Sequence, residues 1–251
     1  MTGFHTFSFD GRSLIDFGGL IRQRPRYVIA VPDIEFEGAP WKSGDRIIDN
    51  HKFKNVEFRV PIRAMAPFCK MTLAEFSQHL TEWLLAVDRT DYHIYRDTYT
   101  PGYYRKVIPT QIDEVIQEKR GVYETTITFN ADPFLYSDRG MLPVTFTSNA
   151  EFEVRKTILN PEKWESLPRI KITGGGDFSC VFGDQSIIFA DVTTGVIIDK
   201  TSETICDLSG NPANDIAYTL KLPKFTTGSN SVVVTGESAF VVEIVPNWRR
   251  L

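Results

Sequence analysis

The stretch Thr72–Val87, TLAEFSQHLTEWLLAV, is the one part of this 251-residue chain with a clear helical pattern. Thr72 can cap the first turn, and Glu75, three residues later, can return the hydrogen bond as a capping box requires. Apolar residues then recur at helical spacing, at Leu73, Phe76, Leu80, Trp83, Leu84 and Val87. The pattern predicts one amphipathic helix over Thr72–Val87 with a single apolar stripe.

Most of the chain around this stretch alternates apolar and polar residues with the two-residue period of half-buried strands. Val56–Ile62 and Tyr123–Phe129 show the alternation, and Tyr92–Arg96 with Tyr103–Ile108 predicts a hairpin. A lone amphipathic helix needs a sheet to cover. The N-terminal part is therefore expected to be an α+β domain in which one principal helix packs on an antiparallel sheet.

The chain from Pro168 onward shows no helical pattern. Short apolar runs are separated there by Gly, Asn and Asp turn signals at intervals of roughly 8–12 residues, which is typical of a β-sandwich or jelly roll. We expect a mainly β protein with an N-terminal domain over residues 1–137 and a C-terminal β-sandwich over residues 138–251.

Composition narrows the class of protein. Hydrophobic residues make up 42% and charged residues 24%, which is ordinary for a soluble globular chain. The net charge of −4 offers no basic footprint for specific nucleic-acid binding, and no apolar run reaches the roughly 18 residues needed for membrane insertion. Cys69, Cys180 and Cys206 are expected to be buried thiols, although a Cys180–Cys206 disulfide stays open.

No catalytic motif is present in the sequence. The four histidines lack HxH or HExxH spacing, no serine lies in a GxSxG context, and the glycine run 174–176 precedes an apolar strand pattern rather than a helix. Asp88 and Asp91 bracket a turn, where aspartates usually support the backbone. We therefore expect a protein that is not an enzyme and that needs no cofactor or metal.

Two groups of residues are candidates for binding. Gly38–Asn50 is polar and is expected to form an extended loop or hairpin tip that carries Trp41. In the C-terminal part, exposed aromatic rings of a β-sandwich can stack on sugars, and Trp164, Tyr218 and Trp248 would supply such rings. The alternative, that these three aromatics pack in the core or between domains, stays open.

Several separated segments follow one another in the order and spacing of a known family. They are TFSFDGRSLIDFGGLIRQRP (residues 6–25), YHIYRDTYTPGYYRKVI (92–108), GVYETTITFNADPFLY (121–136) and NPEKWESLPRIKITGGGDFS (160–179). This succession resembles the distal tail protein (Dit) family of siphophages, the long-tailed bacteriophages. GAPWKSGDRIIDNHKF (38–53) departs from it, because the family often has a Gly-Arg-Asp/Asn-Gly turn there.

The resemblance implies a structural virion protein. Family members form a ring, expected to be a hexamer, that joins the distal end of the tail tube to the baseplate or tail tip. Its partners would be the tail tube protein, a tail-tip protein and receptor-binding or adhesion proteins. The C-terminal domain would be galectin-like, and the protein, made in the host cytoplasm, would reside in the phage tail.

A ring of this kind also requires contacts between subunits and with partner proteins. The residues expected to meet a neighbouring subunit or partner are Asp10, Gly11, Trp41, Lys42 and Arg46. An alternative function is a carbohydrate-binding module that contacts host cell-surface glycans through the C-terminal sandwich.

Overall fold

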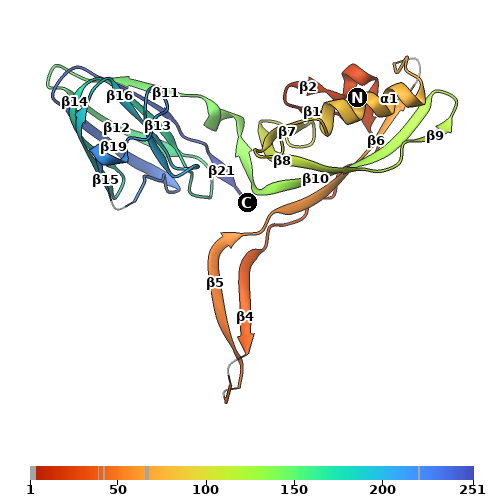
Figure 1. Ribbon diagram of the computed structural model, residues 1–251, viewed down its shortest axis with the longest axis horizontal. Helices are drawn as coiled ribbons and strands as arrows, with labels where there is room; N and C mark the ends of the chain where they lie inside the picture. The colour runs from red at the N-terminus through yellow and green to blue at the C-terminus, as the bar shows by residue number, and fades with distance from the viewer. Residues whose placement is uncertain (1–3, 39, 42, 66–67, 220) are drawn as a thin grey trace. The chain divides into compact units, whose positions relative to one another are not determined.

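The computed structural model describes residues 4–38, 40, 41, 43–65, 68–219 and 221–251 (Figure 1). The chain divides into two compact units, one that ends at Leu135 and one that spans Tyr136–Arg250. Both this division and the expected boundary after residue 137 fall at the end of strand β10 (Val122–Ser137). The expected fold class, a mainly β protein with one principal helix, is confirmed.

The first unit is built on a sheet with the strand order β2-β1-β7-β8-β10-β6-β3, and β9 pairs with β10 at its side. Its strands and 3-10 turn are β1 (Phe7–Phe9), β2 (Arg12–Ser13), η1 (Leu14–Phe17), β3 (Gly19–Ile21), β6 (Val56–Met65), β7 (His93–Asp97), β8 (Tyr103–Ile112) and β9 (Ile116–Lys119). The central pair β10–β6 is antiparallel and runs from Val122 opposite Met65 to Ala131 opposite Val56.

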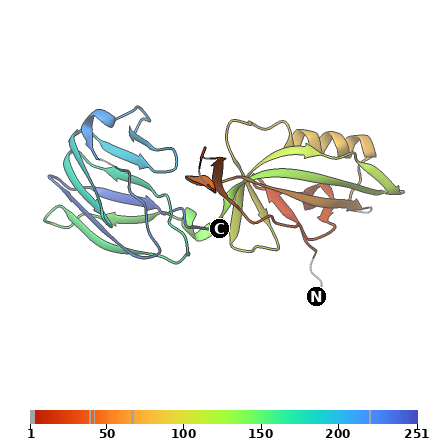
Figure 2. The same cartoon turned by 90° about the horizontal axis from the view of Figure 1, so that it is seen from below.

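Helix α1 (Leu73–Leu84) lies along one face of this sheet (Figure 2). The expected capping box is present, with the Glu75 amide donating to Thr72 Oγ1 at 3.3 Å and the Thr72 amide to Glu75 Oε2 at 2.7 Å. The helix ends at Leu84, three residues before the expected end at Val87. The Asp88 carboxylate accepts from the Thr90 amide at 2.9 Å, and this turn replaces the last helical turn.

The apolar stripe of α1 and the alternating residues of the sheet form one core. Phe58 on β6 stacks on Phe129 on β10 with ring centroids 5.4 Å apart, and Phe7 stacks on Trp83 of the helix at 5.5 Å. Leu80 is fully buried among them. The period-two alternation thus places one side of each long strand against the helix, as expected from the sequence.

On the opposite side of the same strands the buried Glu124 of β10 binds two arginines, Arg22 and Arg63. Arg63 also reaches Glu118 at 3.2 Å. A carboxylate buried beside two guanidinium groups is compensated within its own unit. Arg22, which directly follows β3, therefore contributes to the fold of the first unit.

The second unit is a β-sandwich of two five-stranded antiparallel sheets, with the orders β11-β20-β13-β16-β17 and β12-β19-β14-β15-β18. Its elements are η2 (Asp138–Met141), β11 (Val144–Thr147), β12 (Glu153–Asn160), β13 (Arg169–Thr173), β14 (Gly176–Phe182), β15 (Gln185–Val192), β16 (Gly195–Asp199), β17 (Thr204–Asp207), η3 (Asn214–Ile216), β18 (Ala217–Tyr218), β19 (Gly228–Gly236), β20 (Val241–Val245) and β21 (Arg249–Arg250). Inward side chains of both sheets share one core.

The three cysteines are free thiols, so the Cys180–Cys206 disulfide is not formed. Cys69 and Cys180 are buried, as expected, whereas Cys206 is only partly buried. Burial raises the pKa of the Cys180 thiol to about 12, which keeps it protonated and inert.

Candidate functional site: an exposed hairpin and a polar groove

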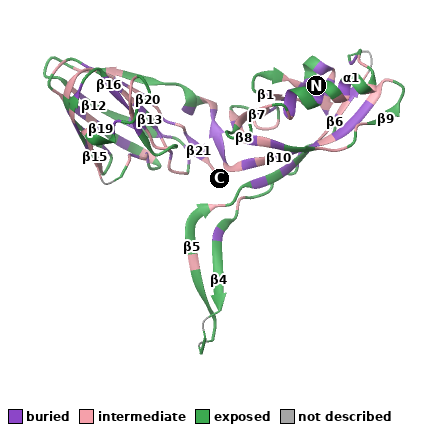
Figure 3. Ribbon diagram, in the orientation of Figure 1, coloured by how far each residue is buried: buried purple, intermediate pink, exposed green. Residues whose placement is uncertain are grey.

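A two-stranded hairpin, separate from the other sheets, is formed by β4 (Pro32–Gly38) and β5 (Asp45–Phe53). Of the two alternatives expected for Gly38–Asn50, an extended loop or a hairpin tip, the structure has a hairpin, and strand β5 already begins at Asp45. Of the residues in these two strands only Asp33 is buried, and Figure 3 shows both strands almost wholly exposed. A hairpin that shields neither face is marginal by itself in water.

One face of this hairpin carries three apolar side chains, together with Asp49, which lies opposite Ile34. Phe36 lies directly opposite Ile47, and Ile34 is two residues before Phe36 on the same face. Phe36 is 67% exposed and Ile47 66% exposed. We call Ile34, Phe36 and Ile47 the hairpin apolar face. An apolar surface on an otherwise solvated ribbon is typical of a protein interaction site.

The tip of the hairpin carries the residues that the sequence singled out. Trp41 is fully exposed and adopts a positive φ of 67°, which an ordinary residue reaches at a cost. Arg46 lies 4.0 Å from Glu37 across the hairpin, and both side chains are mostly exposed. Lys42 lies outside the described residues. Trp41 and Arg46 are therefore available to a partner.

The base of the hairpin is fixed by charges and hydrogen bonds. The buried Asp33 carboxylate meets Lys54 Nζ at 3.2 Å and Lys52 Nζ at 3.4 Å. The Lys54 ammonium, followed by Lys52 and the Asn50 amide, holds the pKa of Asp33 below its usual value. The Lys54 amide also donates to Val31 O at 3.1 Å. The two strands are thus held together at the base of the hairpin, where they leave the main sheet of the first unit.

The segment before β4 is attached to the main sheet by Tyr27. Its hydroxyl donates to the buried Asp97, which also accepts from the amides of Tyr99 and Thr100 at 2.8 and 2.9 Å. The Arg105 guanidinium lies over the Tyr27 ring, 4.5 Å from its centroid. Burial and the Asp97 carboxylate both raise the pKa of Tyr27, so the hydroxyl remains a donor.

The Asp10-Gly11 turn, a second predicted contact, is used within the first unit. Asp10 and Gly11 have positive φ angles of 47° and 83°, as the turn between β1 and β2 requires. The Asp10 carboxylate accepts from the Ile94 amide at 2.9 Å and from His93 Nδ1 at 2.6 Å. Gly11 has open space around it. The turn is therefore tied to β7, and a contact of Gly11 with another subunit stays a prediction.

His93 joins this turn to the end of the helix. Its Nδ1 faces the Asp10 carboxylate, and its Nε2 lies 2.6 Å from the Asp88 carbonyl oxygen. Both partners are acceptors, so only the doubly protonated imidazolium satisfies both contacts. Burial lowers the pKa of His93, but the Asp88 carbonyl and the Asp10 carboxylate outweigh it and leave that pKa raised.

We expect His93→Gln to destabilise the protein in acid more than in alkali. A raised folded-state pKa gives stability that is complete below the unfolded pKa and is lost as the pH rises through the folded pKa. The loss should be about 1 kcal/mol near pH 5.5, since charge-assisted bonds give about 1.5–3 kcal/mol and His93 is partly solvated. Urea denaturation of both proteins at about pH 5.5 and about pH 9 measures it.

The matched control is His79→Gln, because the His79 side chain is 47% exposed on α1. It should show little change in stability at either pH. An equal loss for His93→Gln in acid and alkali would contradict the imidazolium assignment.

The aromatic residues proposed as a sugar platform do not share one environment. Trp248 is 6% exposed and packs on Phe225 with ring centroids 6.0 Å apart, so its assignment as an exposed platform was wrong. Trp164 is partly buried, and its carbonyl accepts from Asn160 Nδ2 at 2.9 Å. Tyr218 on β18 is 63% exposed. Of the three, Tyr218 alone is mostly open to a ligand.

Tyr218 lines an open groove of about 1270 Å³ at the edge of the sandwich. We call it the edge groove. It is formed by β18, residues 219, 221, 222 and 224 after it, the start of β15, the β16–β17 turn and Glu165. Its lining residues are Glu165, Asp184, Gln185, Ser186, Lys200, Glu203, Ala217, Tyr218, Thr219, Lys221, Leu222 and Lys224.

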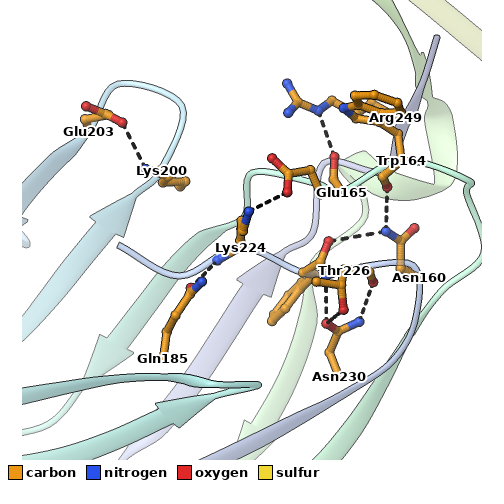
Figure 4. Close-up of polar contacts among 11 residues, drawn as sticks. Asn160, Trp164, Glu165, Gln185, Lys200, Glu203, Lys224, Thr226, Asn230 and Arg249 are labelled. Carbon is orange, nitrogen blue, oxygen red and sulfur yellow. Dashed lines mark hydrogen bonds and ion pairs between the residues drawn. The ribbon is translucent and has the colours of Figure 1, made fainter. Parts of the chain in front are cut away.

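Ion pairs and hydrogen bonds order the charged side chains of the edge groove (Figure 4). Lys224 Nζ donates to Glu165 Oε2 at 2.6 Å, and Lys200 Nζ donates to Glu203 Oε1 at 2.9 Å. The Lys200 ammonium lowers the pKa of Glu203. The Lys224 amide donates to Gln185 Oε1 at 2.8 Å. The groove therefore presents paired donors and acceptors.

Sequence reasoning missed strand β5 and the edge groove. The β-branched pair Ile47-Ile48 was a weak signal for the strand. The groove joins segments that are far apart in the chain. Among the described residues no helix is long and apolar enough to cross a membrane, and no group of three or more His, Cys, Asp or Glu side chains could hold a metal ion.

Comparison with solved structures shows what the whole arrangement is similar to. The chain matches the crystal structure of the SPP1 Dit (gp 19.1) protein, described as a paradigm of the hub adsorption apparatus in phages that infect Gram-positive hosts. The TM-score is 0.70 at 13% sequence identity, over 99% of this chain and 100% of that chain. No family model and no curated protein matches this chain. The two chains share a fold, which confirms the fold expected from the resemblance.

Proposed function

We propose that this chain is a structural subunit of a phage tail, a hub of the adsorption apparatus at the distal end. The observation that carries the proposal is the fold shared with SPP1 Dit over nearly the whole of both chains. A helix-covered sheet and a β-sandwich are each common and carry no function alone. Their succession in one chain, with the order of segments found in the sequence, is much more specific.

In this role the subunits associate as a ring, expected to be a hexamer. Ring closure needs two different surfaces on each subunit that meet head to tail. The hairpin apolar face supports the proposal, because Phe36 and Ile47 are exposed in the single chain and would be covered by a neighbouring subunit. Trp41 and Arg46 at the tip would extend the same contact.

The ring would connect the tail tube protein to a tail-tip protein and would scaffold receptor-binding or adhesion proteins. The protein would be made in the host cytoplasm and reside in the virion. Its role is to position partners, which needs no catalytic step and no cofactor. The net charge of −4 suits a ring through which DNA passes, since a strongly basic lining would bind phosphate.

Imaging the purified protein by negative stain, with light scattering across a range of concentrations, tests the proposal. We expect closed rings of uniform size, and light scattering should give a mass several times that of one 28.5 kDa chain. A protein that stays monomeric both alone and with tail-tube and tail-tip proteins would contradict the hub function.

The second candidate function is glycan binding by the C-terminal sandwich. Of the three aromatic residues considered for it, Tyr218 in the edge groove supports this function, because Trp248 is in the core.

A further inference from the structure

We propose that the edge groove of the second unit is a binding site for a neutral saccharide. The groove is formed entirely by residues of the sandwich. The inference rests on the second candidate function, glycan binding by the sandwich, and specifies its site and ligand class. It does not depend on ring formation, so the hub function can hold if sugar binding fails.

The first argument is the exposed aromatic ring. Tyr218 is 63% exposed and lines the groove beside Thr219 and Ser186. It lies opposite Ile188 of β15, itself 53% exposed. An exposed tyrosine ring leaves apolar surface in contact with water and adds nothing to the core of the sandwich. Such a ring provides an apolar platform for the C–H face of a sugar, and its hydroxyl stays free to bind water or ligand.

The second argument is the kind of polar group beside the ring. Each sugar hydroxyl donates one hydrogen bond and accepts others, so neighbouring hydroxyls are best bound by a donor next to an acceptor. The pairs Lys224–Glu165 and Lys200–Glu203 offer such combinations, with nitrogen and oxygen 2.6 and 2.9 Å apart. Gln185, Ser186 and Thr219 add neutral groups to the lining.

The positive and negative side chains that line the edge groove are equal in number, which favours a neutral ligand. The lining contains three lysines, Lys200, Lys221 and Lys224, and three carboxylates, Glu165, Asp184 and Glu203. Two of the lysines are already paired with carboxylates. A phosphate or uronate would gain little net attraction here and would approach carboxylate oxygens. A polyhydroxylated neutral ligand meets no such repulsion.

The third argument is preorganisation of one wall. Lys224 is followed by the fully buried Phe225, whose amide and carbonyl pair with the Ser166 backbone at 3.1 and 2.8 Å. The Asn230 side chain then accepts from the Thr226 amide at 2.8 Å and donates to the Thr226 carbonyl at 2.8 Å (Figure 4). A wall fixed before binding loses little conformational freedom when a ligand enters.

The test uses the full chain and a defined panel of neutral sugars. Glucose, galactose, N-acetylglucosamine and their disaccharides are titrated by calorimetry and by saturation-transfer NMR. We expect millimolar or tighter binding of at least one, with Tyr218→Ala weakening it about tenfold and Tyr218→Trp retaining it. Glu203→Gln should also weaken binding. Its matched control is Glu153→Gln, which breaks the 2.6 Å pair with Arg155 outside the groove and should leave binding unchanged.

Three results would overturn the proposal. They are the absence of binding by every sugar in the panel to the folded wild type, undiminished binding by a folded Tyr218→Ala variant, and tighter binding of glucuronate or glycerol phosphate than of any neutral sugar. Thermal melting of each variant shows that it is folded. Ring formation is scored separately, so loss of sugar binding alone leaves the hub function untouched.

Discussion

Replacing Leu80 by aspartate is expected to unfold the first unit. Leu80 is fully buried on the apolar stripe of α1, beside Phe76 and Leu84, which are also fully buried. Truncation to alanine at such a site costs about 2–5 kcal/mol. An unpaired carboxylate in the same place adds several kcal/mol of lost hydration. The sum is comparable with the roughly 5–15 kcal/mol that holds a whole domain folded.

Circular dichroism and protection from limited proteolysis measure this loss in the full chain. The matched control is Ala74→Asp, which adds the same charge to the exposed first turn of the same helix, where a negative charge is favourable. It should melt as the wild type does. A soluble Leu80→Asp protein with an unchanged melting curve would show that α1 is not the cover of the sheet.

The helix was predictable because local and tertiary signals agree there. The capping box between Thr72 and Glu75 and the stripe through Leu80 depend on spacing alone. Its end was less predictable. Val87 continues the apolar spacing and packs against the core from outside the helix, because Asp88 forms a turn with Thr90. The spacing of apolar residues indicates which side chains face the core. It does not indicate whether the backbone at those positions is helix or turn.

The hairpin was only partly predictable for a different reason. Alternation reveals a strand when one side is buried, but β5 has no buried residue, so its polar residues resemble a loop. The aromatic candidates show the same limit. Trp248 and Tyr218 are equally visible in the sequence, yet one is in the core and the other lines the edge groove. Only the sheet topology distinguishes them.

The largest functional effect is expected from the double variant Phe36→Ser with Ile47→Ser. The two side chains are cross-strand neighbours on the hairpin apolar face, and both are about two-thirds exposed in the single chain. Their removal should therefore leave the melting temperature of the monomer nearly unchanged. If a neighbouring subunit covers them, each contributes about 1.5–3 kcal/mol to every contact. The loss of about 3–6 kcal/mol weakens association more than a hundredfold.

Light scattering and negative stain at matched concentrations compare the double variant with Leu159→Ser. Leu159 is 64% exposed, which matches Phe36, but it lies on β12 of the second unit. The double variant should remain a monomer under conditions in which Leu159→Ser still assembles, because the hairpin combines exposed apolar side chains with a base fixed by Asp33 and Lys54. Rings of the same size from the double variant would refute the hairpin contact. Dissociation by Leu159→Ser as well would show instead that the sandwich provides the interface.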